Sequence, residues 1–344
     1  MTPKILIIKL SAIGDVVHVL PALHAMRTQF PDGQIDWLVE EPSSPLLQNH
    51  PLLNNLYIFR KKWKKSVLRH LVSDIIPFFK KIRSQKYDWA VDFQGLTKSG
   101  VGAYFSGARR VIGYGDRDGR EFNKLFTNVK VRPSAGLHVV ERNLALLGPL
   151  GIENPPVRFP LPDFPLPQDP YPGQEFIIVN PGAGWQTKRL PLETLADLCA
   201  LVDREQGLRS MISWGPGEED MAEDLCRKIE AKGGRAGVAP PTNLLELSGL
   251  MSRARLFIGG DTGPTHIAAA LGIPVLSFFG ASDARRNSPY GKHCISLQKF
   301  DIPCVPCWKT ACRFKGSRFL TCLSTIKAEE LYQKAKDLIS MTMK

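Results

Sequence analysis

Two kinds of hydrophobic pattern alternate along the chain. Short apolar runs rich in β-branched residues, at 4–10, 35–39 and 56–59, predict strands buried on both faces, as in a parallel sheet. Between and after them, apolar residues recur every three or four positions, as at 16–26 and 67–82, which predicts helices with one buried face. Because strands and helices alternate, the pattern predicts an α/β fold built on parallel sheets.

The same alternation resumes after a proline-rich stretch. Residues 155–172 contain eight prolines, a composition that predicts a stiff linker between two domains. A chain of 344 residues is long enough for two cores. We therefore expect a Rossmann-like domain at 1–160, a second at 174–326, and a final helix at 327–344 that packs back on the first domain.

The stretch 256–280 predicts a strand, a tight loop, a helix, a turn and a second strand. Asp261, Thr262 and Gly263 lie in the loop, where free backbone N–H groups and the positive end of the helix dipole would bind phosphate. His266 follows in the first helical turn, so we expect it to be neutral and to make one hydrogen bond. The alternative is that Asp261 and Thr262 only cap the helix, and the spacing alone does not decide between the two.

Two further loops follow predicted strands. Asp15 occupies a helix N-cap position after the first strand, and the sequence alone favours a capping role. In the second domain, Ala183 and Gly184 lie in a glycine-rich loop that permits close approach of the backbone to a phosphate. Lys188 adds a positive charge to that loop, although an exposed lysine is the simpler interpretation.

Three segments of the chain together resemble the motifs of glycosyltransferase family 9, the ADP-heptose:lipopolysaccharide heptosyltransferases. They read KLSAIGDVVHVLPAL, DFQGLTKSG and GGDTGPTHIAAALGIPVLSFFG, in this order. The resemblance implies the GT-B architecture, in which two Rossmann-like domains face each other across a cleft. It also implies an inverting transfer of heptose from ADP-heptose to the inner core of lipopolysaccharide, either Kdo-lipid A or a heptosylated core. A family 9 transferase that uses a different nucleotide sugar is the alternative.

The resemblance also implies roles for single residues. Asp15 would be the catalytic base for the acceptor hydroxyl, although a helix N-terminus stabilises its carboxylate and weakens it as a base. Lys188 and the loop 261–266 would hold the donor diphosphate, which requires no metal cofactor. Glu218 would bind the ribose, with Glu219 as a rival. The expected donor-binding residues are Ala183, Gly184, Lys188, Glu218, Asp261, Thr262, Gly263 and His266.

Charge points to an anionic partner. The chain has a net charge of +12, with the excess greater in the N-terminal half. The basic run 60–65 is a solvated loop in the simplest interpretation, but the family's acceptor is an anionic lipid-linked sugar at the inner membrane surface. The expected acceptor-binding residues are Arg60, Lys61, Lys64, Gln94 and Arg120. The resemblance also places Glu121, His138, Glu141 and Arg142, less specifically, among the polar cleft residues.

The remaining patterns address location and other classes of function. No apolar run reaches the roughly 18 residues that span a bilayer, and the first residues do not form a signal peptide. We therefore expect a cytoplasmic protein that associates peripherally with the inner face of the cytoplasmic membrane. A nucleic-acid-binding protein is the rival that the basic charge suggests, but the cations cluster in one loop and no nucleic-acid motif is present.

Four of the seven cysteines form a cluster in sequence, Cys304-x2-Cys307-x4-Cys312-x9-Cys322. The first pair has the spacing of zinc ligands, and four thiolates would complete a tetrahedral structural zinc site. The later spacing fits no common zinc module. Free thiols or disulfides are therefore the alternatives.

Overall fold

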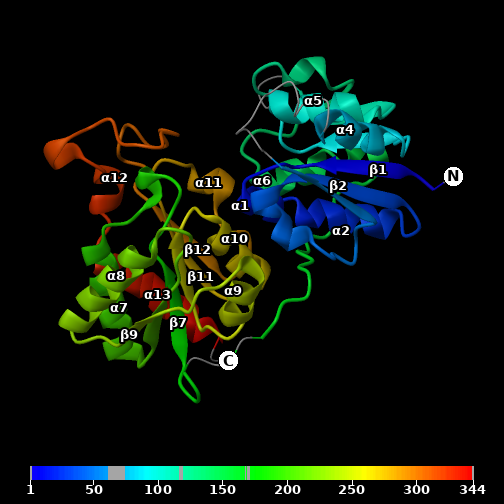
Figure 1. Ribbon diagram of the computed structural model, residues 1–344. Coiled ribbons are helices and arrows are strands. Elements are labelled where there is room, and N and C mark those ends of the chain that lie inside the picture. The colour runs from blue at the N-terminus through cyan, green and yellow to red at the C-terminus, as the bar shows by residue number, and fades with distance from the viewer. Residues whose placement is uncertain (1, 61–73, 116–118, 167, 169–170, 343–344) are drawn as a thin grey trace. The chain divides into compact units, whose positions relative to one another are not determined.

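The computed structural model describes residues 2–60, 74–115, 119–166, 168 and 171–342. The chain divides into two compact units, residues 1–163 and 164–344 (Figure 1). This boundary falls inside the proline-rich stretch 155–172. The described part of each unit contains one six-stranded sheet in which every strand pair is parallel. The predicted α/β class is thus confirmed.

In the first unit the strand order is β3-β2-β1-β4-β5-β6. The central strand β1 is apolar on both faces: residues 5–8 are fully buried, and Ile5 lies opposite Ile35 of one neighbour and Trp89 of the other. The elements are β1 (Lys4–Ile8), α1 (Ile13–Val17), α2 (Leu20–Gln29), β2 (Gln34–Glu40), η1 (Glu41–Leu47), β3 (Asn55–Phe59), α4 (Ile76–Arg83), β4 (Trp89–Asp92), α5 (Thr97–Ser106), β5 (Arg110–Tyr114), η3 (Asn123–Leu125), β6 (Val129–Val131), α6 (Val139–Ala145) and η4 (Gly148–Leu150).

The second unit repeats the plan, with the strand order β12-β11-β10-β7-β8-β9. Its elements are β7 (Phe176–Asn180), η5 (Gln186–Lys188), α7 (Leu192–Gln206), β8 (Arg209–Ile212), α8 (Glu219–Ala231), β9 (Ala236–Val238), α9 (Leu244–Met251), β10 (Phe257–Gly260), α10 (Gly263–Ala270), β11 (Val275–Phe279), α11 (Ala284–Asn287), β12 (Cys294–Gln298), η6 (Gly316–Arg318), α12 (Thr321–Ser324) and α13 (Ala328–Thr342).

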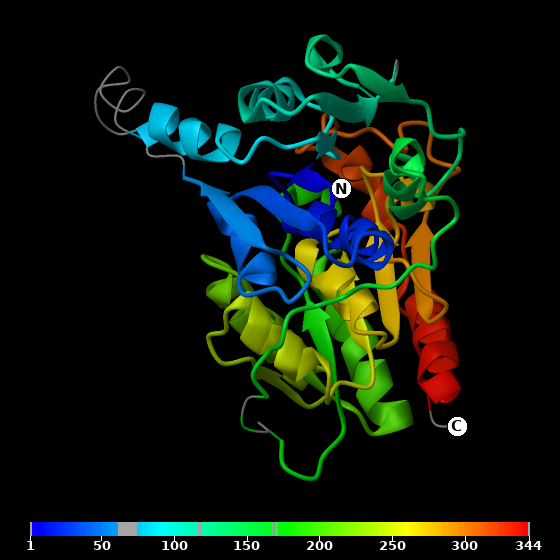
Figure 2. The same ribbon diagram turned by 90° about the vertical axis from the view of Figure 1, so that its right-hand side faces the viewer.

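The last helix, α13, belongs to the second unit. Its apolar stripe, Leu331, Ala335 and Leu338, is fully buried in the core of that unit, and the helix packs on α7, β11 and β12 (Figure 2). At its start, Glu330 pairs with Lys299 at 2.7 Å. The predicted packing of residues 327–344 on the first domain differs from this arrangement, because α7 and the adjoining strands supply a complementary apolar surface within the second unit. No helix in the described part of the chain combines the length and apolarity that crossing a membrane requires.

Candidate functional site

A cluster of charged side chains centres on Asp261, directly after β10. Its Oδ2 lies 2.7 Å from the Nζ of Lys188, and its Oδ1 lies 3.1 Å from the Nε2 of His266. The Nζ of Lys188 also donates to the backbone carbonyl of Asp261 at 3.2 Å. All three residues are buried or nearly so. A single carboxylate therefore fixes a lysine and an imidazole at the start of helix α10.

Asp261 is ionised in spite of its burial. Burial acts to raise the pKa of this carboxyl, but the hydrogen bond and electrostatic interaction with His266 and the charge of Lys188 lower it by more. The net pKa of Asp261 therefore lies far below its usual range. Lys188 is held between this carboxylate and the ring of Trp185, 4.6 Å from the ring centroid. It is consequently not the freely exposed lysine of the simpler interpretation.

Two glycines allow the segment that carries Lys188 to lie over the sheet. A Cβ on Gly260, the last residue of β10, would come within 2.4 Å of the carbonyl oxygen of Lys188. A Cβ on Gly280, after β11, would come within 2.5 Å of the carbonyl oxygen of Thr187. Any larger residue at these positions would push η5 away from the strand ends. The sequence places Lys188 beside Asp261 through these close approaches.

The first turn of α10 is not capped in the way the alternative interpretation requires. Thr262 is the N-cap residue, but within the described residues its side chain makes no capping hydrogen bond. Its Oγ1 instead lies 3.1 Å from the Oγ1 of Thr265, which donates to the carbonyl of Gly260. Helix α10 begins at Gly263, so the positive end of its dipole lies at this polar cluster.

Glu218 is fixed by a residue that the sequence analysis missed. Its Oε2 accepts the N–H of Gly215 at 3.1 Å, and its Oε1 lies 3.5 Å from the guanidinium of Arg189. Arg189 also donates to the carbonyl of Ala183 at 2.8 Å. One guanidinium therefore connects the loop after β7 to the loop before α8. The only sequence signal for it is its position beside Lys188. Gly184 of the same loop is exposed, as is Glu219, the rival of Glu218.

In the first unit, Asp15 is not the N-cap residue that the sequence predicted, because α1 begins at Ile13 and Asp15 lies in its first turn. Its Oδ2 accepts the N–H of Ala12, the N-cap residue, at 3.3 Å, and its Oδ1 lies 3.8 Å from the Nζ of Lys9. The Asp15 side chain is 43% exposed, whereas that of Lys9 is 7% exposed. The carboxylate therefore stabilises the helix start and also faces solvent, with a buried cation behind it. This geometry is compatible with capping and with a proton-accepting role.

Side chains from the ends of β4 and β2 and from helix α5 hold the Asp15 loop in place. The Oε1 of Gln94, after β4, accepts the N–H groups of Leu10 and Ser11 at 3.1 and 3.2 Å. The Nζ of Lys98 contacts the Oγ of Ser11 and the Oε1 of Glu40, both at 3.1 Å. Gln94, predicted to bind the acceptor, thus uses its side-chain oxygen to position the loop.

Asp92, in the same DFQGLTKSG motif as Gln94, lies in the interior of the first unit. It is fully buried, and its carboxylate accepts the backbone N–H groups of Gln94 and Gly95 and the side chains of Ser99 and Asn123. Burial raises the pKa of Asp92 although these four hydrogen bonds lower it. The residue therefore shapes the loop after β4 and does not face a ligand.

Two other predicted acceptor residues, Arg60 and Arg120, lie at the surface. Arg60 is exposed and pairs with Glu41 at 3.0 Å, whereas Lys61 and Lys64 lie outside the described residues. Arg120 is exposed on the loop before η3. His138 and Glu141, assigned less specifically to the cleft, instead form the capping box of α6.

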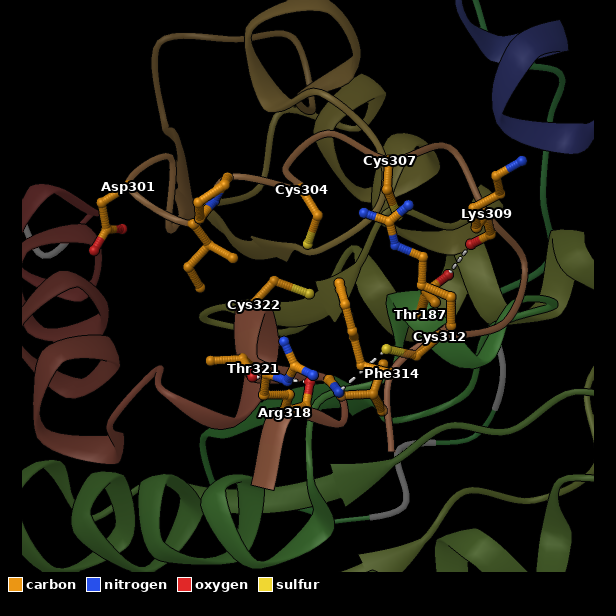
Figure 3. A pocket seen from close by; sticks show the side chains of 14 residues that line it. Thr187, Asp301, Cys304, Cys307, Lys309, Cys312, Phe314, Arg318, Thr321 and Cys322 are labelled. Atoms are coloured by element: carbon orange, nitrogen blue, oxygen red, sulfur yellow. Dashed lines mark hydrogen bonds between the residues drawn. The ribbon is translucent and has the colours of Figure 1, made fainter. Parts of the chain in front are cut away.

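The four clustered cysteines are free thiols, and all four line one pocket of about 690 Å³ in the second unit (Figure 3). Burial, together with the other three thiols, raises the pKa of Cys322 to about 11. Among the described residues, no group of three His, Cys, Asp or Glu side chains is arranged closely enough to hold a metal ion. The cluster in sequence is thus also a cluster in space, although its thiols are not drawn together.

Known proteins resemble this chain in sequence and in fold. Residues 75–317 match glycosyltransferase family 9 (heptosyltransferase). Lipopolysaccharide heptosyltransferase 1 of Pseudomonas aeruginosa is 30% identical over 339 residues, which cover 95% of this chain and 92% of that protein. The structure of E. coli heptosyltransferase WaaC with ADP-2-deoxy-2-fluoro heptose matches with a TM-score of 0.73 and 24% identity over 97% of this chain and 99% of that one. E. coli ADP-heptose lps heptosyltransferase II matches with a TM-score of 0.76 and 19% identity over 99% and 100%. The predicted GT-B fold is confirmed.

Proposed function

This chain belongs to glycosyltransferase family 9, and from that membership we propose that it moves heptose from ADP-heptose to the inner core of lipopolysaccharide with inversion at the anomeric carbon. The observation that carries the proposal is the Asp261–Lys188–His266 cluster at the start of α10. Such a cluster suits a diphosphate leaving group, because a fixed cation and a helix N-terminus both stabilise negative charge. The relative from Pseudomonas aeruginosa supports the heptosyl class.

In the proposed donor complex, the diphosphate binds at the first turn of α10. Thr262 and Gly263 offer a hydroxyl and a backbone N–H there, and Lys188 offers its ammonium group. Asp261 holds Lys188 and His266 in position, so little reorganisation is needed when charge develops on the departing phosphate. Glu218, oriented by Arg189, binds the ribose hydroxyls. The loop at Ala183 and Gly184 approaches the nucleotide with its backbone.

The reaction is a single displacement. An acceptor hydroxyl forms the new bond to the anomeric carbon, its proton passes to the carboxylate of Asp15, and the bond to the diphosphate breaks with both electrons leaving on ADP. The exposed part of Asp15 is suited to accept that proton. Lys9 and the Ala12 N–H orient the carboxylate. This scheme needs no metal cofactor, because Lys188 and the helix N-terminus oppose the leaving-group charge.

The acceptor would be an anionic lipid-linked sugar, so the first unit should carry a surface that suits an acidic bilayer. Four large apolar side chains are exposed on α5 and around η3: Tyr104 (63%), Phe105 (45%), Phe122 (70%) and Leu125 (78%). Helices α4 and α5 lie side by side in both views, and α5 also contacts η3 (Figures 1 and 2). We name these four side chains the apolar patch.

Exposed cations lie beside two residues of the apolar patch in the chain and on α4, the helix that contacts α5. Arg120 and Lys124 are exposed next to Phe122 and Leu125 in the chain, and Lys80 lies on α4. A surface of exposed aromatic side chains bordered by cations is suited to the interface of an anionic membrane. We therefore propose peripheral attachment through the apolar patch, with Arg60, Lys61, Lys64, Gln94 and Arg120 as the acceptor-binding residues.

Donor and acceptor are tested together by incubating the purified protein with ADP-heptose and truncated lipopolysaccharides of increasing core length. Mass spectrometry should detect the addition of one heptose to one of these acceptors. Other nucleotide sugars serve as matched controls, since a family 9 enzyme with a different donor would use the same diphosphate groups. Transfer from another nucleotide sugar but not from ADP-heptose would contradict the proposed donor, and stabilisation by oligonucleotide but not by ADP would favour the nucleic-acid alternative.

A further inference from the structure

The four clustered cysteines line one pocket of the second unit without being in contact distance for a shared metal ion. Cys304, Cys307 and Cys312 lie between β12 and η6, whereas Cys322 lies in α12. All four line the same pocket, and Figure 3 shows the sulfur atoms of Cys304 and Cys322 directed into the same space. Folding therefore assembles four soft ligands from two segments.

The pocket is lined by positive charge, which would offset the negative charge of a thiolate metal centre. Four thiolates around a divalent cation carry a net charge of −2. Lys309, Arg313 and Arg318 also line the pocket, and the single carboxylate among the described lining residues is Asp301. Three cations beside the cluster would offset the negative charge of such a centre.

One sulfur already receives a hydrogen bond from the backbone. The N–H of Leu320 donates to the Sγ of Cys312 at 3.5 Å, drawn as a dashed line in Figure 3. Such a bond stabilises a thiolate more than a thiol, because the acceptor then carries a full negative charge. The arrangement is that expected of the outer hydrogen bonds that support a metal ligand.

The segment that carries three of the cysteines has no regular secondary structure and leaves large apolar side chains partly exposed. Residues 299–315 form no helix or strand in the structure, all of them being described. Ile302 and Val305 pack against the core of the unit, but Phe300 and Trp308 are 45% and 41% exposed. A segment of this kind is one that a structural metal would hold together.

Two hydrogen bonds connect this segment to Thr187, the neighbour of Lys188, and to Ala281, which follows β11. The Oγ1 of Thr187 donates to the carbonyl of Lys309 at 2.5 Å, and the N–H of Trp308 donates to the carbonyl of Ala281 at 2.9 Å. Thr187 lines the cysteine pocket and directly precedes Lys188. The position of Lys188 therefore depends on the segment between Cys307 and Cys312.

We propose that Cys304, Cys307, Cys312 and Cys322 bind one thiophilic divalent metal ion, which fixes Thr187 and thereby holds Lys188 in place for the donor. Four sulfur ligands favour tetrahedral zinc, with iron as the other metal of that chemistry. Binding would draw the thiols together, which the irregular backbone of residues 299–315 permits. The metal site stands by itself, whereas its effect on Lys188 rests on the proposed function.

The metal site is tested by elemental analysis of the purified full-length protein for zinc and iron. We expect about one metal ion per chain, reduced severalfold or more by Cys304→Ser and by Cys312→Ser. Cys294→Ser is the matched control, because this thiol lies outside the cluster and should leave the metal content unchanged. The four thiols should resist alkylation until a chelator is added. A metal-free protein whose four thiols alkylate freely, or whose mass shows disulfides among them, would overturn the proposal.

The effect on Lys188 is tested by calorimetry with ADP. We expect removal of the metal to weaken ADP binding by about fivefold or more, and Thr187→Val to do the same while retaining the metal. Unchanged ADP affinity in both cases would overturn the effect on Lys188 and leave the metal site standing. A metal-loaded protein that binds no ADP would instead contradict the proposed function, so the two failures are distinguishable.

Discussion

The Nζ of Lys188 lies 2.7 Å from the Oδ2 of Asp261, although 73 positions separate the two residues in the chain. The lysine belongs to a short 3-10 turn after β7, and the aspartate follows β10. Parallel neighbouring strands bring the two loops to one edge of the sheet. Positive charge is thus fixed at the N-terminus of α10 before any ligand binds.

The first prediction concerns this pair. Asp261→Asn keeps the size of the side chain but leaves Lys188 largely buried without its counter-ion, which costs about 3 kcal/mol or more in pairs of this kind. We expect the free energy of unfolding to fall, measured by urea denaturation at pH 7. The control is Asp261→Asn combined with Lys188→Met, which should recover part of the loss. A single variant as stable as the native protein would show that the pair does not stabilise the fold.

The same pair predicts a pH dependence. Because the folded pKa of Asp261 lies below its ordinary value of 3.8, its stabilising contribution is complete at neutral pH and is lost as the pH falls below that value. Unfolding measured between neutral and strongly acidic pH should therefore show a steeper loss of stability in the native protein than in Asp261→Asn. Parallel pH profiles would indicate that another group dominates acid unfolding.

A second prediction tests the base. Asp15→Asn retains an oxygen that can accept the Ala12 N–H but cannot take a proton from the acceptor hydroxyl. We expect kcat to fall by about two orders of magnitude or more, with the melting temperature and ADP affinity nearly unchanged. An active variant would refute the base assignment. A large loss of stability would favour the capping role instead.

A third prediction tests the phosphate position. Thr262→Val and His266→Ala remove hydrogen-bonding groups from the first turn of α10. ADP affinity measured by calorimetry should fall in both variants, by an amount typical of a lost charge-assisted hydrogen bond, about 1.5–3 kcal/mol. Thr325→Val, the same change as at Thr262 but at the end of α12, is the matched control. If both variants bind ADP as the native protein does, the diphosphate binds elsewhere.

A fourth prediction concerns the apolar patch. The double variant Phe122→Ser with Leu125→Ser should bind vesicles rich in anionic lipid more weakly than the native protein, since each side chain would contribute about 1.5–3 kcal/mol if fully buried. Leu166→Ser, at an exposed leucine of the second unit, is the control. Co-sedimentation with anionic and zwitterionic vesicles measures the effect. Equal binding of the variant and the native protein would exclude the patch as the attachment surface.

The sequence by itself determined the local elements and their class. The buried strand at residues 5–8 and the strand-loop-helix at 256–271 follow from apolar period, glycine position and helix-start chemistry, all of which act between near neighbours. The motifs that indicated glycosyltransferase family 9 are of the same kind, because each is a continuous segment. For this reason both the fold class and the family were accessible without coordinates.

Only the tertiary structure decided which side chains meet. It paired Lys188 with Asp261 and Arg189 with Glu218, directed Asp92 into the interior, and used the apolar stripe of α13 within the second unit. It also brought Cys304 and Cys322 to one pocket next to Thr187. Contacts of this kind depend on strand order and on close backbone approaches, which the hydrophobic period of a single segment does not encode.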